Sequence, residues 1–204
     1  IQKEFDKIKN FLPTLSNFKI KNLSMAVLAA KICALKDKSI YSKIKKIKDV
    51  NGRLELVKKY TNNTKVFVDY AHTPDALSKT LISLKKTYKK NINLVFGCGG
   101  DRDKKKRPLM AKIANLYCKK IYVTDDNPRN ESPQKIRKQL LKYISPDKRI
   151  EIAKRSVAIK KSIQNANPNE IILVAGKGHE EHQIYKNKIY NISDKEIIKK
   201  INLK

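Results

Sequence analysis

The sequence predicts an α/β protein built on a doubly wound, mainly parallel sheet with a C-terminal hairpin, preceded by a helical segment. Two observations support this prediction. From residue 65 onward, short apolar runs alternate with amphipathic stretches of helical length, which is the pattern of strands joined by crossover helices. The apolar runs end in clusters of Gly, Asp, His and Arg, as expected at the carboxyl ends of parallel strands, where such sheets bind ligands.

Residues 1–64 precede this regular pattern and are expected to be mostly helical or irregular. The stretch 23–35 carries apolar residues at helical spacing, with small side chains that allow close packing. Asn51-Gly52 gives a turn signal before a short apolar alternation. Because the regular alternation begins at residue 65, we expect one domain to span 65–204.

Strand and helix candidates alternate along that second part of the chain. The expected strands are short apolar runs at 65–70, 92–97, 120–124, 149–153 and 170–176. The expected helices are amphipathic stretches at 74–88, 106–120, 132–144 and 156–166. Pro74 and Pro133 suit first helical positions, and Ser132 suits an N-cap. The tail at 182–193 alternates like a hairpin before a last short helix, so the whole is a Rossmann-like arrangement.

The net charge raises the question of a nucleic-acid partner. The chain has 47 Lys and Arg against 19 Asp and Glu, so its formal charge is 47 − 19 = +28. Seven cations are Arg, which leaves 47 − 7 = 40 Lys, whereas base readout and bidentate phosphate contacts favour Arg. Aromatic residues make up 7% and do not interleave with the cations. We expect a solvated Lys-rich surface and no nucleic acid; the alternative, a basic nucleic-acid-binding module, would bind with steep salt dependence.

Cysteine usage and hydropathy favour a cytoplasmic protein. Cys33, Cys98 and Cys118 form no CxxC pair and no even framework, as expected for reduced thiols. No apolar stretch approaches the length of a membrane span. The first ten residues lack the apolar core of a signal peptide and an initiator Met, so we expect a piece of a longer protein.

Four loops at the expected strand ends gather the uncommon residues of the chain. Together they hold all three His and five of the six Gly, and they span 69–75, 97–108, 124–130 and 175–183. Their common position predicts one wall of a binding site. They contain neither GxGxxG nor GxxxxGK[ST]. His179 and His182 match neither HExxH nor HxxEH, so no metal site is expected.

The loop at 124–130 combines both charges in a short space. Asp126 and Arg129 flank Asn127-Pro128, a dipeptide that favours turn initiation. An ordinary turn does not need the guanidinium. A carboxylate and a guanidinium held by a rigid proline suit a ligand with an ammonium and a carboxylate, which is an amino acid.

Taken together, the four loops resemble one family. The segments VDYAHTPDAL, FGCGGDRDKKKRPLM, VTDDNPR and VAGKGHE, in this order and spacing, are closely similar to motifs of the muramyl (Mur) ligases. The resemblance spans 65–204, the family's C-terminal domain. Segments 51–55 and 17–30 resemble the end of its central domain, so 1–64 is expected to be a remnant of the central ATP-binding domain.

The resemblance implies an ATP-dependent amide-bond ligase of peptidoglycan precursor synthesis. It points to the branch that adds meso-diaminopimelate to UDP-N-acetylmuramoyl-L-alanyl-D-glutamate through an acyl phosphate. The cofactors implied are ATP and Mg²⁺, with the magnesium ligands and the phosphate loop outside this chain. No catalytic residue is therefore expected here, and the chain alone is expected to be an inactive monomer.

The resemblance also assigns residues to ligands. Those expected to bind meso-diaminopimelate are Arg102, Asp126, Asn127, Pro128, Arg129, Gly176 and Glu180. Those expected near ATP are Arg53, Asp69 and His72; by spacing alone His72 could equally be a satisfied capping residue. Lys105 and His182 depart from the family, which usually has Gly and an aromatic at these positions. A further alternative is a stand-alone, Rossmann-like amino-acid-binding domain without catalysis.

Overall fold

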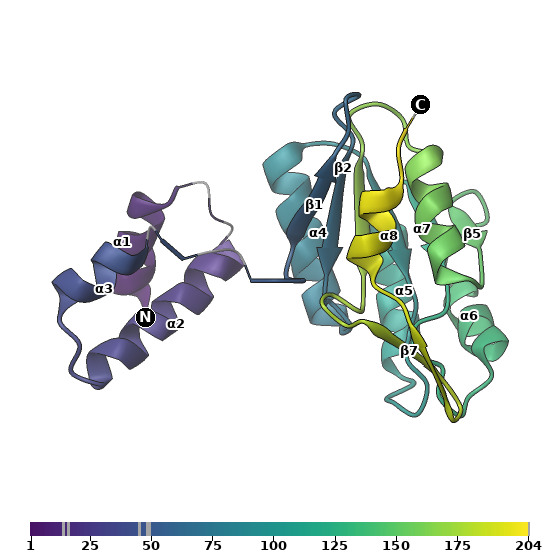
Figure 1. Ribbon diagram of the computed structural model, residues 1–204, viewed down its shortest axis with the longest axis horizontal. Coiled ribbons are helices and arrows are strands. Elements are labelled where there is room, and N and C mark those ends of the chain that lie inside the picture. The colour runs from purple at the N-terminus through teal and green to yellow at the C-terminus, as the bar shows by residue number, and fades with distance from the viewer. Residues whose placement is uncertain (14, 16, 45, 48–49, 204) are drawn as a thin grey trace. The chain divides into compact units, whose positions relative to one another are not determined.

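The computed structural model of the chain describes residues 1–13, 15, 17–44, 46–47 and 50–203. It divides into two compact units, Ile1–Asp49 and Val50–Lys204, drawn in Figure 1. The sequence placed the start of the second domain at 65, and the structure adds residues 50–64 to the second unit. They belong there because they carry a strand that pairs with the sheet.

The first unit is a small helical unit. It contains α1 (Gln2–Phe11), α2 (Asn17–Ile32) and α3 (Asp37–Ile44). A small apolar core of Ile8, Ile20, Val27 and Ile44 joins them. Buried Glu4 accepts hydrogen bonds from Lys31, at 2.7 Å, and from the Tyr41 hydroxyl. The helix predicted within 23–35 is the second half of α2, which ends at Ile32.

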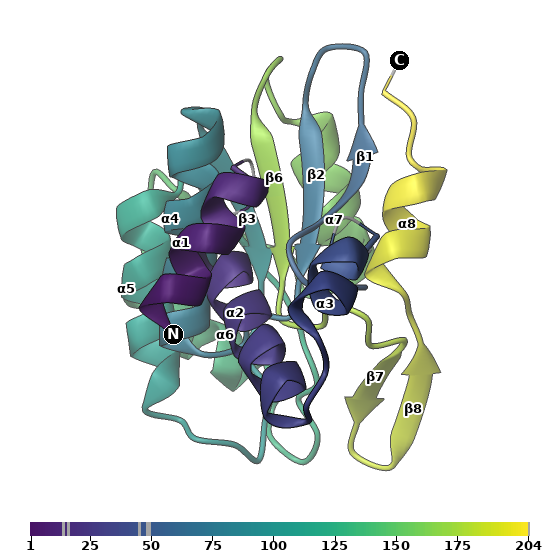
Figure 2. The ribbon, with the colours of Figure 1, turned by 90° about the vertical axis from the view of Figure 1, so that its left-hand side faces the viewer.

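The second unit is a six-stranded sheet. Its strands are β1 (Glu55–Lys59), β2 (Lys65–Asp69), β3 (Ile92–Phe96), β4 (Lys120–Val123), β5 (Arg149–Glu151) and β6 (Ile171–Ala175). They lie in the order β1-β2-β6-β3-β4-β5. β1 is antiparallel to β2, and all other neighbours are parallel, which confirms the predicted mainly parallel sheet. Figure 2 shows β6, β2 and β1 side by side.

Five helices accompany the sheet. They are α4 (Pro74–Tyr88), α5 (Lys106–Tyr117), α6 (Pro133–Leu141), α7 (Arg155–Gln164) and α8 (Asp194–Lys200). The predicted caps form: the Ser132 hydroxyl accepts a hydrogen bond from Lys135 N, and proline opens α4 and α6. α5 stops before the predicted residue 120 because Cys118 is extended.

Helices cover both faces of the sheet. Alternate strand residues point to opposite faces, so in β6 Leu173 packs with α4, α5 and α6, whereas Ile172 and Val174 pack with α7 and α8. Leu77, Leu81 and further buried residues fill the first core. The two apolar layers confirm the doubly wound arrangement and fix the carboxyl ends of the parallel strands at one edge.

A two-stranded hairpin lies beyond that carboxyl edge (Figure 2). It consists of β7 (His182–Tyr185) and β8 (Lys188–Asn191), as the sequence predicts. Its attachment was not predicted. Arg129 N donates to Ile184 O at 3.0 Å, and Lys186 N donates to Arg129 O at 2.7 Å. The hairpin therefore extends the loop that follows β4. No helix among the described residues is long and apolar enough to cross a membrane.

A buried ion pair attaches α8 to the sheet. The Arg155 guanidinium donates to both Asp194 carboxylate oxygens, at 2.8 and 2.7 Å, and to Ala175 O at 3.0 Å. Neither charged side chain is exposed. Burial of charges in this way is tolerated only when each has its partner.

Asp194→Asn should destabilise the protein strongly, by roughly 3–5 kcal/mol, because Arg155 would remain buried with an uncompensated charge. The matched control is Glu196→Gln in the same helix, whose pair with Lys199 has more than half of both side chains exposed and should contribute little. Urea unfolding followed by circular dichroism measures both changes. Equal losses would contradict the role assigned to the buried pair.

Candidate functional site

Loops that follow three strands meet at the carboxyl edge of the sheet, and glycine lets them approach closely. A Cβ at Gly100 would lie 1.8 Å from Pro128 O, so only glycine fits there. Gly100 N donates to Asn127 O at 2.9 Å. Gly176 has φ +113°, and a Cβ there would lie 2.9 Å from an Asp126 carboxylate oxygen. The loops after β3, β4 and β6 thus form one surface.

A buried arginine joins the first two of these loops. Arg107 of α5 is fully buried; its guanidinium donates to both Glu131 carboxylate oxygens, at 2.9 and 3.0 Å, and to Gly99 O at 3.0 Å. Glu131 also accepts from Asp101 N at 2.8 Å. The hydrogen bonds from Arg107 lower the pKa of Glu131 to about 2. The carboxylate is therefore charged throughout the neutral range and holds both loops.

Asn127 lies at the centre of the surface. It is buried, and its amide oxygen accepts from Lys177 Nζ and from Ile184 N, each at 3.1 Å. Its amide nitrogen donates to Glu180 at 3.2 Å. One side chain therefore connects the loop after β4, the loop after β6 and the start of the hairpin.

Two predicted arginines flank Gly99. A Cβ at Gly99 would lie 3.0 Å from Arg129 Nη1 and 3.8 Å from Arg102 Cγ. Arg129 Nη1 donates to Gly100 O at 2.9 Å, and Arg102 Nη1 donates to Asp101 O at 3.1 Å. Arg102 is exposed and Arg129 is half-buried, so both guanidinium groups have donors left for a ligand.

Two carboxylates belong to the same surface. Asp126 lies against Gly176 and accepts a hydrogen bond from Asn127 N at 2.8 Å. Glu180 is about one third exposed, and it accepts from Lys177 at 3.3 Å as well as from Asn127. The structure therefore brings together the residues predicted to bind an amino acid: Arg102, Asp126, Asn127, Pro128, Arg129, Gly176 and Glu180.

A second group of predicted residues surrounds Tyr70. The Arg53 guanidinium lies 4.4 Å from the centre of the Tyr70 ring. The rings of His72 and His179 lie 4.6 and 5.5 Å from it. Burial raises the pKa of Tyr70, and the Glu180 carboxylate acts in the same direction. Arg53 and His72 are exposed, so their polar groups remain accessible.

Asp69 differs from these neighbours because it is buried. Its oxygens accept from Leu54 N at 2.5 Å, Ala71 N at 2.8 Å and the Thr80 hydroxyl at 3.3 Å. Burial raises the pKa of Asp69, while these hydrogen bonds act to lower it. The carboxylate thus holds Leu54, whose φ is +46°, beside the end of β2.

Sequence reasoning missed several polar residues beneath the surface. The sequence does not distinguish Lys177 from the exposed lysines of the chain, because its complete burial is a tertiary effect. Gln183 donates to Asp125 O and Asp126 O, at 3.1 and 2.7 Å. Asp125 pairs with Arg137. No pattern in the sequence signals these contacts.

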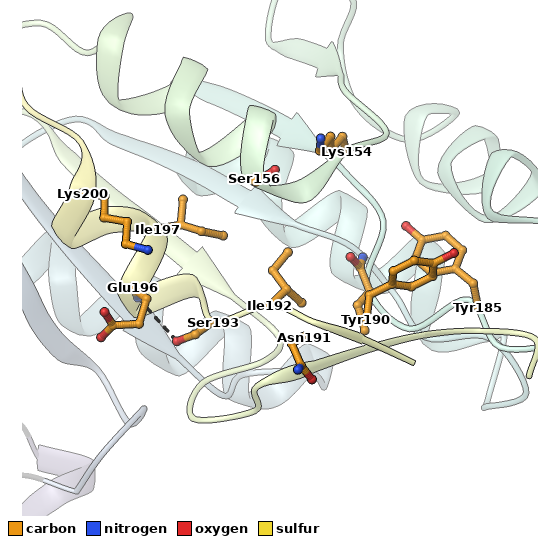
Figure 3. A pocket seen from close by; sticks show the side chains of 11 residues that line it. Lys154, Ser156, Tyr185, Tyr190, Asn191, Ile192, Ser193, Glu196, Ile197 and Lys200 are labelled. Atoms are coloured by element: carbon orange, nitrogen blue, oxygen red, sulfur yellow. Dashed lines mark hydrogen bonds between the residues drawn. The ribbon is translucent and has the colours of Figure 1, made fainter. Parts of the chain in front are cut away.

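Metal-binding groups and cavities among the described residues could also contribute to a ligand site. Among the residues that the structure describes, no group of three or more His, Cys, Asp or Glu is placed to hold a metal ion. A pocket of about 620 Å³ lies between the hairpin and α8 (Figure 3). The Tyr185–Tyr190 ring pair is at one end and α8 at the other. It contains none of the predicted ligand residues.

Comparison with known proteins identifies the class. Residues 52–178 match the family model described as "Mur ligase, glutamate ligase domain". The match covers more than half of the chain and includes the loops after β2, β3 and β4, so the chain belongs to the Mur ligase family.

Three of the similar proteins carry the name UDP-N-acetylmuramoyl-L-alanyl-D-glutamate–2,6-diaminopimelate ligase. The relative from Rickettsia montanensis is 43% identical over 190 residues, which cover 92% of this chain and 39% of the relative. The one from Prochlorococcus marinus is 39% identical over 202 residues, or 96% and 40%. A solved structure with that name has 34% identity and a TM-score of 0.69, covering 91% and 38%. The chain thus spans about two fifths of these relatives.

Glu131→Gln should destabilise the protein by roughly 3–5 kcal/mol at neutral pH, because it removes the charge that compensates fully buried Arg107. Urea unfolding measures the loss, and Glu196→Gln again serves as the exposed control. A similar loss in both variants would contradict this assignment.

The same pair predicts a pH dependence. The pKa of Glu131 falls from an ordinary 4.5 to about 2 on folding, so its stabilisation is complete above pH 4.5 and is lost as the pH falls toward 2. The unfolding free energy should therefore decrease as the pH falls from about 4.5 to about 2, and decrease less in Glu131→Gln. Parallel pH profiles for the two proteins would contradict the prediction.

Proposed function

We propose that this chain is the C-terminal part of an ATP-dependent ligase that adds meso-diaminopimelate to UDP-N-acetylmuramoyl-L-alanyl-D-glutamate in peptidoglycan precursor synthesis. The observation that carries the proposal is the juxtaposition of Asn127, Arg129 and Glu180 on one surface. The names of the similar proteins support it. The surface offers cationic and anionic groups within reach of one small zwitterion.

Charge complementarity supports diaminopimelate over lysine as the bound amino acid. Diaminopimelate differs from lysine by a second carboxylate on its far end. Arg129 and Arg102 would receive that carboxylate, and Glu180 with Asp126 would receive the ammonium beside it. A charge-assisted hydrogen bond is worth roughly 1.5–3 kcal/mol, about 10- to 100-fold in affinity. Lysine would leave the guanidinium groups without this partner, which adds discrimination.

The backbone at Arg129 supports a role for its side chain. Its φ is +51°, in the left-handed region that favours glycine or asparagine. Hydrogen bonds with Ile184 and Lys186 hold this conformation. A residue kept in an unfavourable backbone conformation is a candidate for function. Here the function of the guanidinium would account for an arginine at a position that favours glycine.

The role of this chain in the reaction would be to position the nucleophile. ATP bound elsewhere in the ligase would supply the phosphoryl group that activates the glutamyl carboxylate of the acceptor as an acyl phosphate. The diaminopimelate amine would attack that carbon: the new C–N bond forms, the nitrogen loses a proton, and phosphate leaves with the C–O electron pair. Holding the amino acid on a rigid surface contributes through proximity and orientation.

The residues around Tyr70 would face ATP. Arg53 and His72 are exposed and carry groups that suit phosphate or ribose oxygens. Asp69 would act indirectly, because its oxygens already hold Leu54, Ala71 and Thr80. We place the magnesium ligands and the phosphate loop in the rest of the ligase, with the first unit, Ile1–Asp49, as part of the central domain. We expect a cytoplasmic monomer.

Arg129→Ala in the complete ligase should raise the KM for meso-diaminopimelate by about 10- to 100-fold and leave the KM for ATP nearly unchanged. Steady-state kinetics with each substrate varied in turn measures the two constants. Equal effects on both constants would refute the specificity assignment.

Two further variants distinguish the effect of losing the guanidinium from the effect of the strained backbone at Arg129. Arg129→Gly removes the same group but suits the left-handed conformation, so it should match Arg129→Ala in KM. Arg149→Ala removes an exposed guanidinium that, like Arg129, donates to a carbonyl, here Leu141 O at 2.8 Å. It should leave both constants unchanged.

The 204-residue chain alone should release no phosphate from ATP when both other substrates are present. It contains no GxxxxGK[ST] loop to hold the phosphates. A phosphate-release assay, with a complete diaminopimelate ligase as positive control, measures this. Turnover by the chain alone would refute the division of roles proposed above.

A further inference from the structure

Lys177 is a charged side chain with no exposed surface. It follows β6 between Gly176 and Gly178, whose φ values are +113° and +56°. Its ammonium donates to Asn127 Oδ1 at 3.1 Å, to Glu180 Oε2 at 3.3 Å and to His182 O. Three donors meet three acceptors on three segments, so the hydrogen-bonding capacity of the ammonium is used completely.

Stability alone does not account for this lysine. Desolvation of an ammonium costs several kcal/mol, and buried ion pairs are often replaced by apolar groups without loss. Here the compensating carboxylate, on Glu180, keeps about one third of its side chain in solvent. Apolar groups in place of Lys177 and its acceptors together would fill the same space without the desolvation cost. The buried charge therefore points to a task beyond packing.

The contacts of Lys177 determine which way the Asn127 amide faces. Lys177 Nζ and Ile184 N are both donors, so only the amide oxygen of Asn127 satisfies them. The amide nitrogen is thereby turned toward Glu180. The ammonium also contacts Glu180 directly, so a single buried group orients both side chains.

We propose that Lys177 is a positioning residue that presents the Asn127 amide and the Glu180 carboxylate to the incoming amino acid. The inference rests on the proposed function, because that function places both side chains against diaminopimelate. Its contact with His182 O also fixes the start of the hairpin, whose Ile184 N supplies the second donor to Asn127. Lys177 itself is covered by the loops and does not touch the ligand.

The first test needs no ligand. In isotopically labelled protein, a nuclear Overhauser contact between the Asn127 Hδ2 and Glu180 Hγ protons reports the amide orientation. Lys177→Met, which has similar length and no donor, should abolish this contact while the backbone spectrum stays dispersed. If the contact persists in the variant, the proposal is overturned.

The matched control is Lys119→Met. Lys119 pairs with Glu170 at 2.6 Å, next to the amino ends of β4 and β6 and therefore at the opposite edge of the sheet. This variant loses an ion pair of the same type and should keep the Asn127–Glu180 contact. If Lys177→Met does not fold, Lys177→Gln takes its place. If neither folds, Lys177 is a requirement of the fold and the proposal fails.

The second test uses binding of meso-diaminopimelate to the 204-residue chain, measured by calorimetry. Lys177→Met should weaken binding at least about tenfold, and Lys119→Met should not. In a background of Asn127→Ala and Glu180→Ala, adding Lys177→Met should change the Kd less than about twofold, because Lys177 acts through these two residues. The same loss in both backgrounds would indicate a general structural effect and overturn the proposal.

The two tests separate this inference from the function on which it rests. If the unsubstituted chain does not bind meso-diaminopimelate, the proposed function fails for this chain. The Asn127–Glu180 contact then still decides whether Lys177 orients the amide. If the chain binds and Lys177→Met binds equally well, the positioning role fails and the proposed function stands.

Discussion

The buried pair of Arg107 and Glu131 is the interaction on which the candidate binding surface depends. Without it, Gly99 O and Asp101 N would lose the partners that hold the glycine-rich loop beside the loop after β4. The guanidinium has no exposed area, so its charge can be matched only by this carboxylate. The pair therefore fixes the distance between two loops, and with it the positions of Arg102 and Arg129, although neither paired residue offers a group to the ligand.

Similar pairs of a buried cation and a carboxylate lie beneath the other loops. Arg155 with Asp194 holds Ala175 O at the end of β6, Arg137 pairs with Asp125, and Lys177 reaches Glu180. Each buried cation meets a carboxylate below or within the carboxyl edge. The net charge of +28 therefore describes the surface lysines and says little about the site, where positive and negative groups are interleaved. Such interleaving suits a zwitterion better than a polyanion.

The sequence predicted the strands, helices, caps and hairpin because each depends on local patterns: period-two apolar runs, Pro74 and Pro133 at helix starts, and Ser132 as a cap. It also placed the candidate ligand residues on one edge, since parallel strands end together. It missed β1 as a sheet strand, because an antiparallel edge pairing depends on tertiary contact. The burial of Lys177 could not be predicted for the same reason. The spacing of residues along the sequence does not show which side chain the folded loops enclose.

The two departures from the family motifs show which atoms the surface needs. His182 contributes its backbone carbonyl, which accepts from Lys177, and its exposed ring contacts Asn191 Oδ1 at 3.1 Å. Lys105 contributes its backbone amide, which donates to Asp103 at 2.8 Å, and its side chain is exposed. A carbonyl or an amide is supplied by almost any residue. The side chains at these positions are therefore free to vary, whereas Asn127, Lys177 and Glu180 act through side-chain atoms that no common replacement reproduces.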